Sequence, residues 1–254
     1  MMCTGCSART WRLVLPFVLV GGLVAGCGGN KWDYVALGDS TPAGFGVERS
    51  YVDYYAEFIE LDLDTEVEVH NFSRSGQTVA TMLKRIQGDE DARAALRDAE
   101  VITVWTGWND LRNPLDVFRA GTCGGQDNLD CVREAVEVLN GSLDSALDEI
   151  VALASPDETL IRVADTGIHL VSTWQYHGWF ETLQGPCYEV WREHLVEAAE
   201  ARGITVVYTY HVLNGPDGDE KTDGIYLDDG IHFNDAGHRL VAELHREAGY
   251  AYAP

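Results

Sequence analysis

The stretch Tyr34-Val35-Ala36-Leu37-Gly38-Asp39-Ser40 is a short apolar run that ends abruptly in polar residues. Apolar runs of this length are typical of strands in a parallel sheet, because helices cover both faces of such a sheet. Similar runs recur along the chain, and the predicted strands are Asp33–Leu37, Val67–Asn71, Val101–Trp105, Leu160–Ala164 and Ile204–Tyr208. Helical patterns separate them, which predicts an α/β fold with a parallel five-stranded sheet between two helix layers.

The segments between the predicted strands carry apolar residues at helical spacing. The longest begins at Cys131 and presents one apolar face through to Leu153. The predicted helices are Tyr51–Leu61, Val79–Ile86, Asp91–Ala99, Cys131–Leu153 and Tyr188–Ala201. A last helix is expected to begin at Asn234, because an asparagine side chain can accept a hydrogen bond from a free amide of the first turn.

The first 26 residues have the pattern of a secretory targeting segment. Arg9 and Arg12 precede an apolar run that is too short to span a membrane comfortably and closes on Leu23-Val24-Ala25-Gly26-Cys27. Small residues before a cysteine resemble the bacterial lipobox, which implies cleavage after Gly26, lipidation of Cys27 and a short tether over residues 27–32. An ordinary signal peptide or an uncleaved anchor are the alternatives. The expected location is therefore outside the cytoplasm, on the periplasmic or extracellular face of a membrane.

The rest of the chain, residues 33–254, is expected to form one domain. Hydrophobic residues make up 46% of the sequence, which is typical of a globular protein. The formal net charge is −23, and such a surface repels nucleic acid phosphates, so a nucleic-acid-binding role is discounted. The same charge favours uncharged esters or zwitterionic lipids as ligands. No feature of the sequence indicates an oligomer, and a monomer is expected.

The cysteines suggest one disulfide in an exported domain. Cys123 and Cys131 bracket a loop-like stretch and are expected to pair, which leaves Cys187 as a buried or free thiol. A bridge from Cys187 to either of the other two is the alternative, since spacing alone does not fix the pairing.

Polar residues follow the first three predicted strands, at the edge of the sheet where ligands bind in parallel α/β proteins. Ser40 follows the first strand, Gly76 the second and Asn109 the third, while Asp229 and His232 lie in the loop before the last helix. Each of these signals is weak alone. Together, and in this order, they are the parts that a serine nucleophile needs: a base, a group that orients the base, and donors for an oxyanion.

At this point the chain resembles the SGNH hydrolases, also called GDSL esterases and lipases. The matching motifs are Gly38-Asp39-Ser40, Gly76, Gly107-Trp108-Asn109-Asp110 and Asp229-Gly230-Ile231-His232, and the resemblance runs from about Tyr34 to Val241. It implies a flavodoxin-like three-layer α/β/α sandwich, and with the lipobox it implies a bacterial lipoprotein member of that family.

The resemblance also implies roles for individual residues. Ser40 would be the nucleophile, His232 the general base and Asp229 the carboxylate that orients the imidazole. The backbone N–H groups of Ser40 and Gly76 and the side-chain amide of Asn109 would form the oxyanion hole. The rate of such an enzyme is expected to fall in acid as His232 becomes protonated.

Other residues near these motifs could be assigned the same roles. Asp228 is a rival carboxylate with the wrong spacing, and Ser73 and Ser75 are more simply read as turn residues. The chain departs from the commoner family pattern at Thr41-Pro42, so the entrance to the site is expected to differ in shape.

Aromatic residues are candidates for the substrate pocket. Trp108 lies within the third motif, and Trp174 and Trp179 belong to an aromatic run after the fourth strand. For the run, core packing and a binding wall are equally supported. We take Trp108, Trp174 and Trp179 as candidate pocket residues, with the loop between Cys123 and Cys131 as a further wall. No cofactor and no metal are expected, because the histidines other than His232 form no convincing set with acidic neighbours.

The functional expectation is a serine esterase that acts through an acyl-enzyme on short or medium acyl esters, lysolipids or acetylated sugars. An acyltransferase with the same three residues is one alternative, and a non-catalytic surface binding lipoprotein is another. The intact Ser-His-Asp set argues against the second alternative.

Overall fold

The computed structural model describes residues 31–222 and 224–252. The expected signal segment, the lipidated Cys27 and most of the tether lie outside the described residues. Within the described ranges, no helix combines the length and the apolar character that a membrane crossing requires.

A five-stranded parallel sheet forms the middle layer, in the order β2-β1-β3-β4-β5. Its strands are β1 (Lys31–Gly38), β2 (Glu66–Asn71), β3 (Val101–Trp105), β4 (Leu160–Ala164) and β5 (Thr205–Val207). Every neighbouring pair is parallel, so all carboxyl ends lie at one edge. The predicted α/β class with a parallel five-stranded sheet is confirmed.

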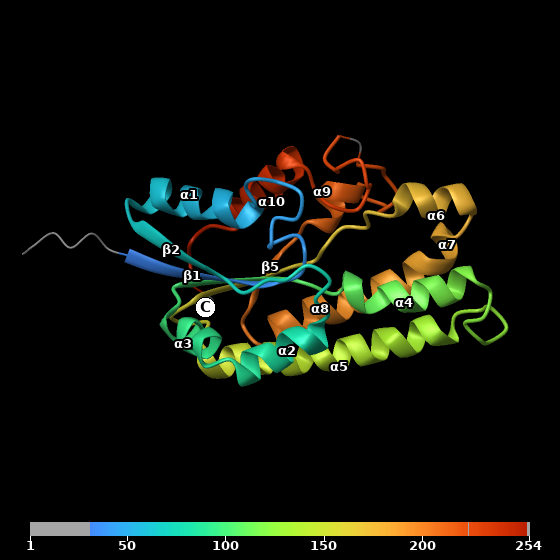
Figure 1. The fold of residues 1–254 in the computed structure, drawn as a ribbon, viewed down its shortest axis with the longest axis horizontal. Helices are drawn as coiled ribbons and strands as arrows, with labels where there is room; N and C mark the ends of the chain where they lie inside the picture. Colours follow the sequence, from blue (N-terminus) through green and yellow to red (C-terminus); the bar gives the residue numbers. More distant parts are fainter. Residues whose placement is uncertain (1–30, 223, 253–254) are drawn as a thin grey trace, which may run out of the picture.

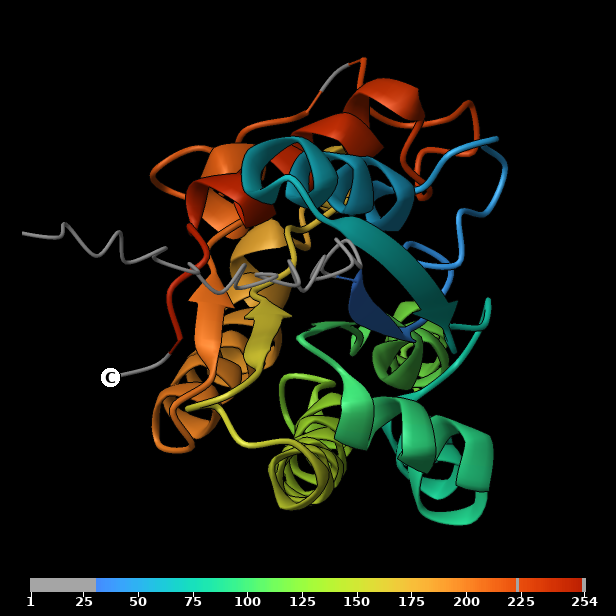
Figure 2. The same cartoon turned by 90° about the vertical axis from the view of Figure 1, so that its left-hand side faces the viewer.

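Helices cover both faces of the sheet (Figure 1; Figure 2). One layer holds α1 (Tyr51–Leu63) and α10 (Asp235–Glu247), which pack side by side. The other holds α2 (Val79–Gly88), α3 (Glu90–Asp98), α4 (Trp108–Arg119), α5 (Asp130–Leu153) and α8 (Val190–Glu200). Between β4 and β5 lie α6 (Val171–His177), α7 (Phe180–Leu183) and the π-helical turn η1 (Gln184–Glu189), and α9 (Tyr210–Asn214) follows β5.

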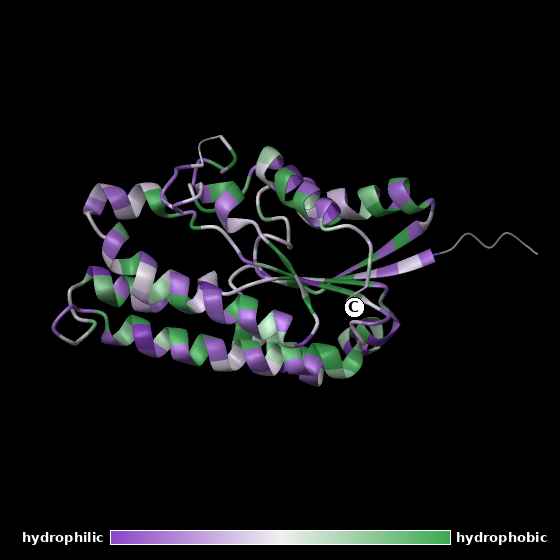
Figure 3. Cartoon of the chain, turned by 180° about the vertical axis from the view of Figure 1, so that it is seen from behind, coloured by the Kyte–Doolittle hydropathy of each residue, from purple (hydrophilic) through white to green (hydrophobic). Residues whose placement is uncertain are grey.

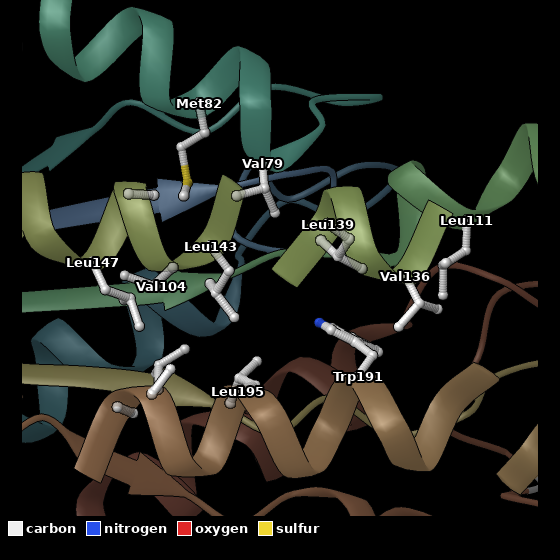
Figure 4. Packing of buried hydrophobic residues seen from close by; sticks show 14 of the residues in the cluster. Val79, Met82, Val104, Leu111, Val136, Leu139, Leu143, Leu147, Trp191 and Leu195 are labelled. Atoms are coloured by element: carbon white, nitrogen blue, oxygen red, sulfur yellow. The ribbon is translucent and has the colours of Figure 1, made fainter. Parts of the chain in front are cut away.

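The alternation of side chains along the strands builds a core on each face. Val35 and Val104 face the layer of α2, α5 and α8, whereas Tyr34 and Val101 face α1 and α10. Figure 4 shows Val79 and Met82 of α2 with α5 side chains on one side, and Leu195 of α8 opposite. The central strands β3 and β4 are buried along their whole length, as in a sheet that is covered on both faces. The edge strand β2 and the first residues of β1 are partly hydrophilic (Figure 3).

The predicted elements differ from the structure in one important place. All five strands are found within two residues of their predicted ends, and the predicted Asn234 cap accepts a hydrogen bond from the N–H of Gly237 at 3.1 Å. The helix α4 was not predicted, because Gly107, the Asn109-Asp110 pair and Pro114 all read as turn signals. The aromatic run after β4, expected as a loop, forms α6 and the start of α7.

Gly38 fixes how β1 ends and therefore where Ser40 lies. Its φ is +142°, and a Cβ atom there would lie 2.0 Å from the backbone oxygen of Trp105 on β3. Only glycine fits this close approach of two backbones. The N–H of Asp39 also donates to the oxygen of Trp105 at 3.2 Å, so the turn that presents Ser40 is tied to the neighbouring strand.

Candidate active site

Ser40, His232 and Asp229 form a continuous hydrogen-bonded chain at the carboxyl edge of the sheet. The Nε2 atom of His232 lies 3.1 Å from Oγ of Ser40, and its Nδ1 atom lies 2.7 Å from Oδ2 of Asp229. The ring of Phe45 lies against the imidazole, with the ring centroids 4.2 Å apart. The fold thus brings together two segments that are 192 residues apart in sequence.

The backbone holds Asp229 in its orientation toward the imidazole. Its Oδ1 atom accepts hydrogen bonds from the N–H groups of Ile231 at 2.9 Å and His232 at 3.0 Å. Burial pushes the pKa of Asp229 upward, but the hydrogen bonds from His232 and Ile231 outweigh this and lower the pKa to about 2. The carboxylate is therefore ionised at neutral pH. The rival Asp228 is exposed and makes no hydrogen bond or ion pair to any other described residue.

Three hydrogen-bond donors are available around Ser40. Among residues 31–222 and 224–252, the backbone N–H groups of Ser40 and Gly76 have no acceptor. The Nδ2 atom of Asn109 donates to the oxygen of Gln77 at 3.1 Å and lies 3.5 Å from Oδ2 of Asp39, which holds the amide at the edge of the cavity. Gly76 has a φ of +78° and open space where a Cβ would be, so the backbone conformation, rather than a close contact, favours glycine there.

Two buried carboxyl groups lie beneath these donors. Asp39 accepts from the N–H of Thr41 at 3.0 Å, and Asp110 accepts from the N–H of Val79 at the start of α2 at 3.0 Å. Burial raises the pKa of Asp39 to about 7 and that of Asp110 to about 6. Because each carboxyl holds its proton more tightly in the folded protein, each lowers stability as pH rises from about 4 toward its folded value.

We expect Asp39→Asn to stabilise the protein at neutral pH. The variant cannot ionise, so its gain over the parent should grow from near zero at pH 4 to about 2–4 kcal/mol above pH 7. Urea unfolding of both proteins across this range measures the difference. The exposed Asp157→Asn is the matched control and should show no such trend. Equal pH slopes for Asp39→Asn and the parent would contradict the assignment.

A cavity of about 580 Å³ opens beside Ser40. One wall comes from α4, whose Trp108, Arg112, Leu115 and Arg119 recur at helical spacing on one face. The full lining is Asp39, Ser40, Thr41, Phe45, Ser75, Gly76, Trp108, Asn109, Arg112, Leu115, Asp116, Arg119, His169, Leu170, Ile231 and His232. Every predicted triad and oxyanion-hole residue except Asp229 lines this cavity, and Asp229 lies behind His232.

The sequence analysis did not single out most of the cavity wall. The α4 face was visible as an i, i+4, i+7 pattern, but it was not recognised because residues 108–119 were not predicted to be helical. His169 had no signal at all. Its ring lies against Trp108 at 4.5 Å between centroids, and burial, followed by the proximity of His232, lowers the pKa of His169 to about 4. It is therefore neutral at pH 7.

The expectations for Trp174 and Trp179 need correction. Trp108 lines the cavity as expected. Trp174 is 0% exposed and packs in the core, because α6 turns its apolar side toward the α4–α8 layer. Trp179 is partly buried against the same core and contacts Phe118. Neither lines the cavity.

The loop between Cys123 and Cys131 does not form a pocket wall either. The two cysteines are joined by a disulfide at the end of α4 and the start of α5, and Cys187 is buried with a free thiol. The loop is absent from the cavity lining. Because the disulfide closes the connection between α4 and α5, we assign the loop a structural role.

Replacing both Cys123 and Cys131 with serine should therefore separate stability from activity. Opening a ring that spans 8 positions should cost about 2–3 kcal/mol of unfolding free energy by chain entropy. Turnover of a short ester should change less than about twofold. Urea unfolding and a 4-nitrophenyl butyrate assay measure the two effects. An altered preference among 4-nitrophenyl esters of different acyl chain length would contradict the structural role and indicate that the loop contacts the substrate.

One group of potential metal ligands lies elsewhere. Asp33, Glu68 and His70 on β1 and β2 place ligand atoms within 4.8 Å of one another. His70 bonds to Asp33 at 3.0 Å, and Glu68 pairs with Lys31. These contacts account for the cluster as surface ion pairing, away from Ser40 at the other end of β1.

A serine, a histidine and an aspartate that are hydrogen-bonded in this order are an arrangement that serine hydrolases of several folds share. Residues 36–240 match the model of the GDSL-like lipase/acylhydrolase family. The chain belongs to this family and is a carboxylic ester hydrolase, which confirms the resemblance found in the sequence.

Solved structures share the fold. The lipase Lip_vut3 from a goat rumen metagenome superposes with a TM-score of 0.70 at 24% identity, covering 88% of this chain and 100% of that chain. The acetylxylan esterase Axe2 from Geobacillus stearothermophilus superposes with a TM-score of 0.62 at 18% identity, covering 89% of this chain and 99% of that chain. TesA superposes with a TM-score of 0.57 at 18% identity, covering 85% of this chain and 97% of that chain. No curated protein matches the chain by sequence.

Proposed function

We propose that this protein hydrolyses short or medium acyl esters through Ser40, His232 and Asp229. The observation that carries the proposal is the chain of two hydrogen bonds from Oγ of Ser40 through His232 to an aspartate that is ionised at neutral pH. A serine hydroxyl becomes a nucleophile when a base removes its proton, and the base is effective when a carboxylate orients it.

The reaction follows from this geometry. Nε2 of His232 accepts the Ser40 proton as Oγ attacks the ester carbonyl, and Asp229 stabilises the imidazolium that forms. The N–H groups of Ser40 and Gly76 and the side-chain amide of Asn109 donate to the oxyanion. His232 then gives its proton to the leaving alcohol as the ester C–O bond breaks, and the acyl group stays bonded to Oγ of Ser40. Water attacks in the second half, with His232 again acting as the base.

The cavity supports a substrate of modest size. Its volume of about 580 Å³ is in the range of small-molecule sites, and Phe45, Leu115 and Ile231 give it an apolar side next to Ser40. Structures with this fold include proteins described as a lipase and as acetylxylan esterases. Acyl esters and acetylated sugars are therefore the first substrates to test.

Hydrolysis of 4-nitrophenyl acetate, butyrate and octanoate by the purified chain tests the proposal. We expect turnover that favours the two shorter esters. Covalent labelling by a fluorophosphonate without hydrolysis would instead favour an acyltransferase. If the protein neither hydrolyses these esters nor takes up the fluorophosphonate, the non-catalytic binding lipoprotein would be favoured.

We also propose that the protein is exported and anchored through a lipid on Cys27. Support comes from the sequence of residues 1–27 alone, with its basic start, apolar run and small residues before the cysteine. Metabolic labelling with a palmitate analogue in a bacterial host should mark the parent and not Cys27→Ala. Equal labelling of both proteins would contradict this.

A further inference from the structure

A second, open hollow of about 510 Å³ adjoins the cavity. The two share Ser75 and Gly76, so the hollow begins where the oxyanion donor of Gly76 lies and extends along α2 to its end at Gly88. Its lining is Arg74, Ser75, Gly76, Gln77, Thr81, Lys84, Arg85, Gly88 and Asp89. Three of these side chains are cationic and one is anionic.

The single acid of the hollow is already neutralised. Asp89 caps α3 by accepting from the N–H groups of Asp91 and Ala92, and it pairs with Arg85 at 3.4 Å. Arg85 also donates to the backbone oxygen of Phe72 at 2.7 Å and lies over the Phe72 ring. This pair forms a fixed wall, and the remaining charge of the hollow comes from Arg74 and Lys84.

Arg74 and Lys84 are unpaired in a protein that has ample acid to pair them. The net charge is −23, and surface cations elsewhere, such as Arg93, Arg202 and Arg246, contact carboxylates. Among the described residues, the lysine and arginine side chains without a hydrogen bond, ion pair or ring contact are Arg74, Lys84, Arg97, Arg112 and Lys221. Arg74 and Lys84 line the hollow, and Arg112 lines the cavity.

Three of these five unpaired cations of the described residues thus line the cavity or the hollow next to it, against the sign of the whole molecule. We propose that this enzyme prefers esters that carry an anionic group, such as a carboxylate, a phosphate or a sulfate, which the hollow of Arg74 and Lys84 binds. The inference rests on the proposed esterase function and names its substrate class. It reverses the expectation of uncharged substrates, which came from the net charge alone.

The expected preference is moderate because both cations are exposed. Exposed ion pairs contribute little each and are screened by salt. Two of them should raise kcat/KM for an anionic ester by about five- to tenfold over a neutral ester of the same size. This advantage should disappear in high salt, as electrostatic attraction at an open surface does.

Two substrate pairs test the proposal on the full chain and show which side of the ester carries the charge. The acyl pair is the 4-nitrophenyl monoester of adipic acid against 4-nitrophenyl hexanoate. The alcohol pair is acetylated glucuronic acid against acetylated glucose. We expect the anionic member of one pair to show the five- to tenfold advantage in 20 mM salt and none in 500 mM salt.

Variants locate the effect. In Arg74→Gln/Lys84→Gln the ratio of anionic to neutral kcat/KM should fall to about one. In Arg97→Gln/Lys221→Gln, which removes two unpaired cations outside the hollow, the ratio should stay at the parent value. A ratio near one for both pairs in the parent, or equal ratios in the two double variants, would overturn the inference while leaving the esterase function intact. Failure to hydrolyse any of the four esters would overturn the esterase function as well.

Discussion

Ser40→Ala should lower kcat/KM for 4-nitrophenyl butyrate by about 10⁴-fold or more, to a rate near that of the uncatalysed reaction. The hydroxyl at 40 is hydrogen-bonded to Nε2 of His232 at 3.1 Å, and alanine leaves His232 and Asp229 with no nucleophile to activate. In a catalytic triad the three residues act together, so losing the nucleophile removes nearly all of the rate enhancement that the triad provides. Steady-state kinetics with trace contamination excluded by active-site titration measures the loss.

Ser75→Ala is the comparison that gives this result its meaning. Ser75 lines both the cavity and the hollow but has no hydrogen bond to His232, so its loss should cost less than about tenfold. The Ser40 variant should unfold at the same urea concentration as the parent, because Oγ is at the edge of the fold. A Ser40 variant that keeps more than a hundredth of the parent rate would contradict its role.

Asn109→Ala should lower kcat by about 10²–10³-fold and leave KM nearly unchanged. The oxyanion exists in the transition state and not in the bound ester, so a lost donor appears in kcat. Asn109 is suited to this role because its Nδ2 is held by the oxygen of Gln77 at 3.1 Å while its side chain lines the cavity. Full kinetic curves with 4-nitrophenyl butyrate separate the two constants.

The control for this variant is Asn113→Ala, one turn further along α4. Asn113 is exposed, lies outside the cavity and makes no side-chain contact within the described residues, so its replacement should change kcat less than twofold. Urea unfolding checks the Asn109 variant, which also loses the bond to Gln77. A rise in KM with kcat unchanged would indicate a binding residue and contradict the oxyanion role.

The parts of the site that could be predicted are those set by strand ends. The apolar run of β1 closes on Gly38-Asp39-Ser40, so the local sequence places Ser40 at the end of that strand. The close approach of Gly38 to the backbone of Trp105 on β3, which fixes the turn, is visible only in the structure. Gly76 and Asn109 follow β2 and β3 in the same way, since the carboxyl ends of parallel strands share one edge. The placement of His232 beside them needed the family resemblance, because no local pattern fixes where a loop crosses that edge.

The parts that could not be predicted depend on packing between distant elements. Pro114 is the seventh residue of α4, where a proline removes a backbone donor and usually interrupts a helix. Together with the turn-forming pair before it, Pro114 therefore argued against a helix at residues 108–119. Trp174 has a sequence environment that suits a pocket wall, and only the packing of α6 shows that it is buried. Net charge likewise gave no sign that Arg74 and Lys84 would line a hollow next to the cavity without an ion-pair partner among the described residues.

The most direct test of the central claim is to find which atom forms the covalent bond. The full chain treated with a fluorophosphonate should gain the mass of one adduct, and peptide mapping should place it on Ser40. His232→Ala should label far more slowly, because the hydroxyl then lacks its base. An adduct on Ser73 or Ser75, or an active enzyme that takes no label, would contradict the assignment of Ser40 as the nucleophile.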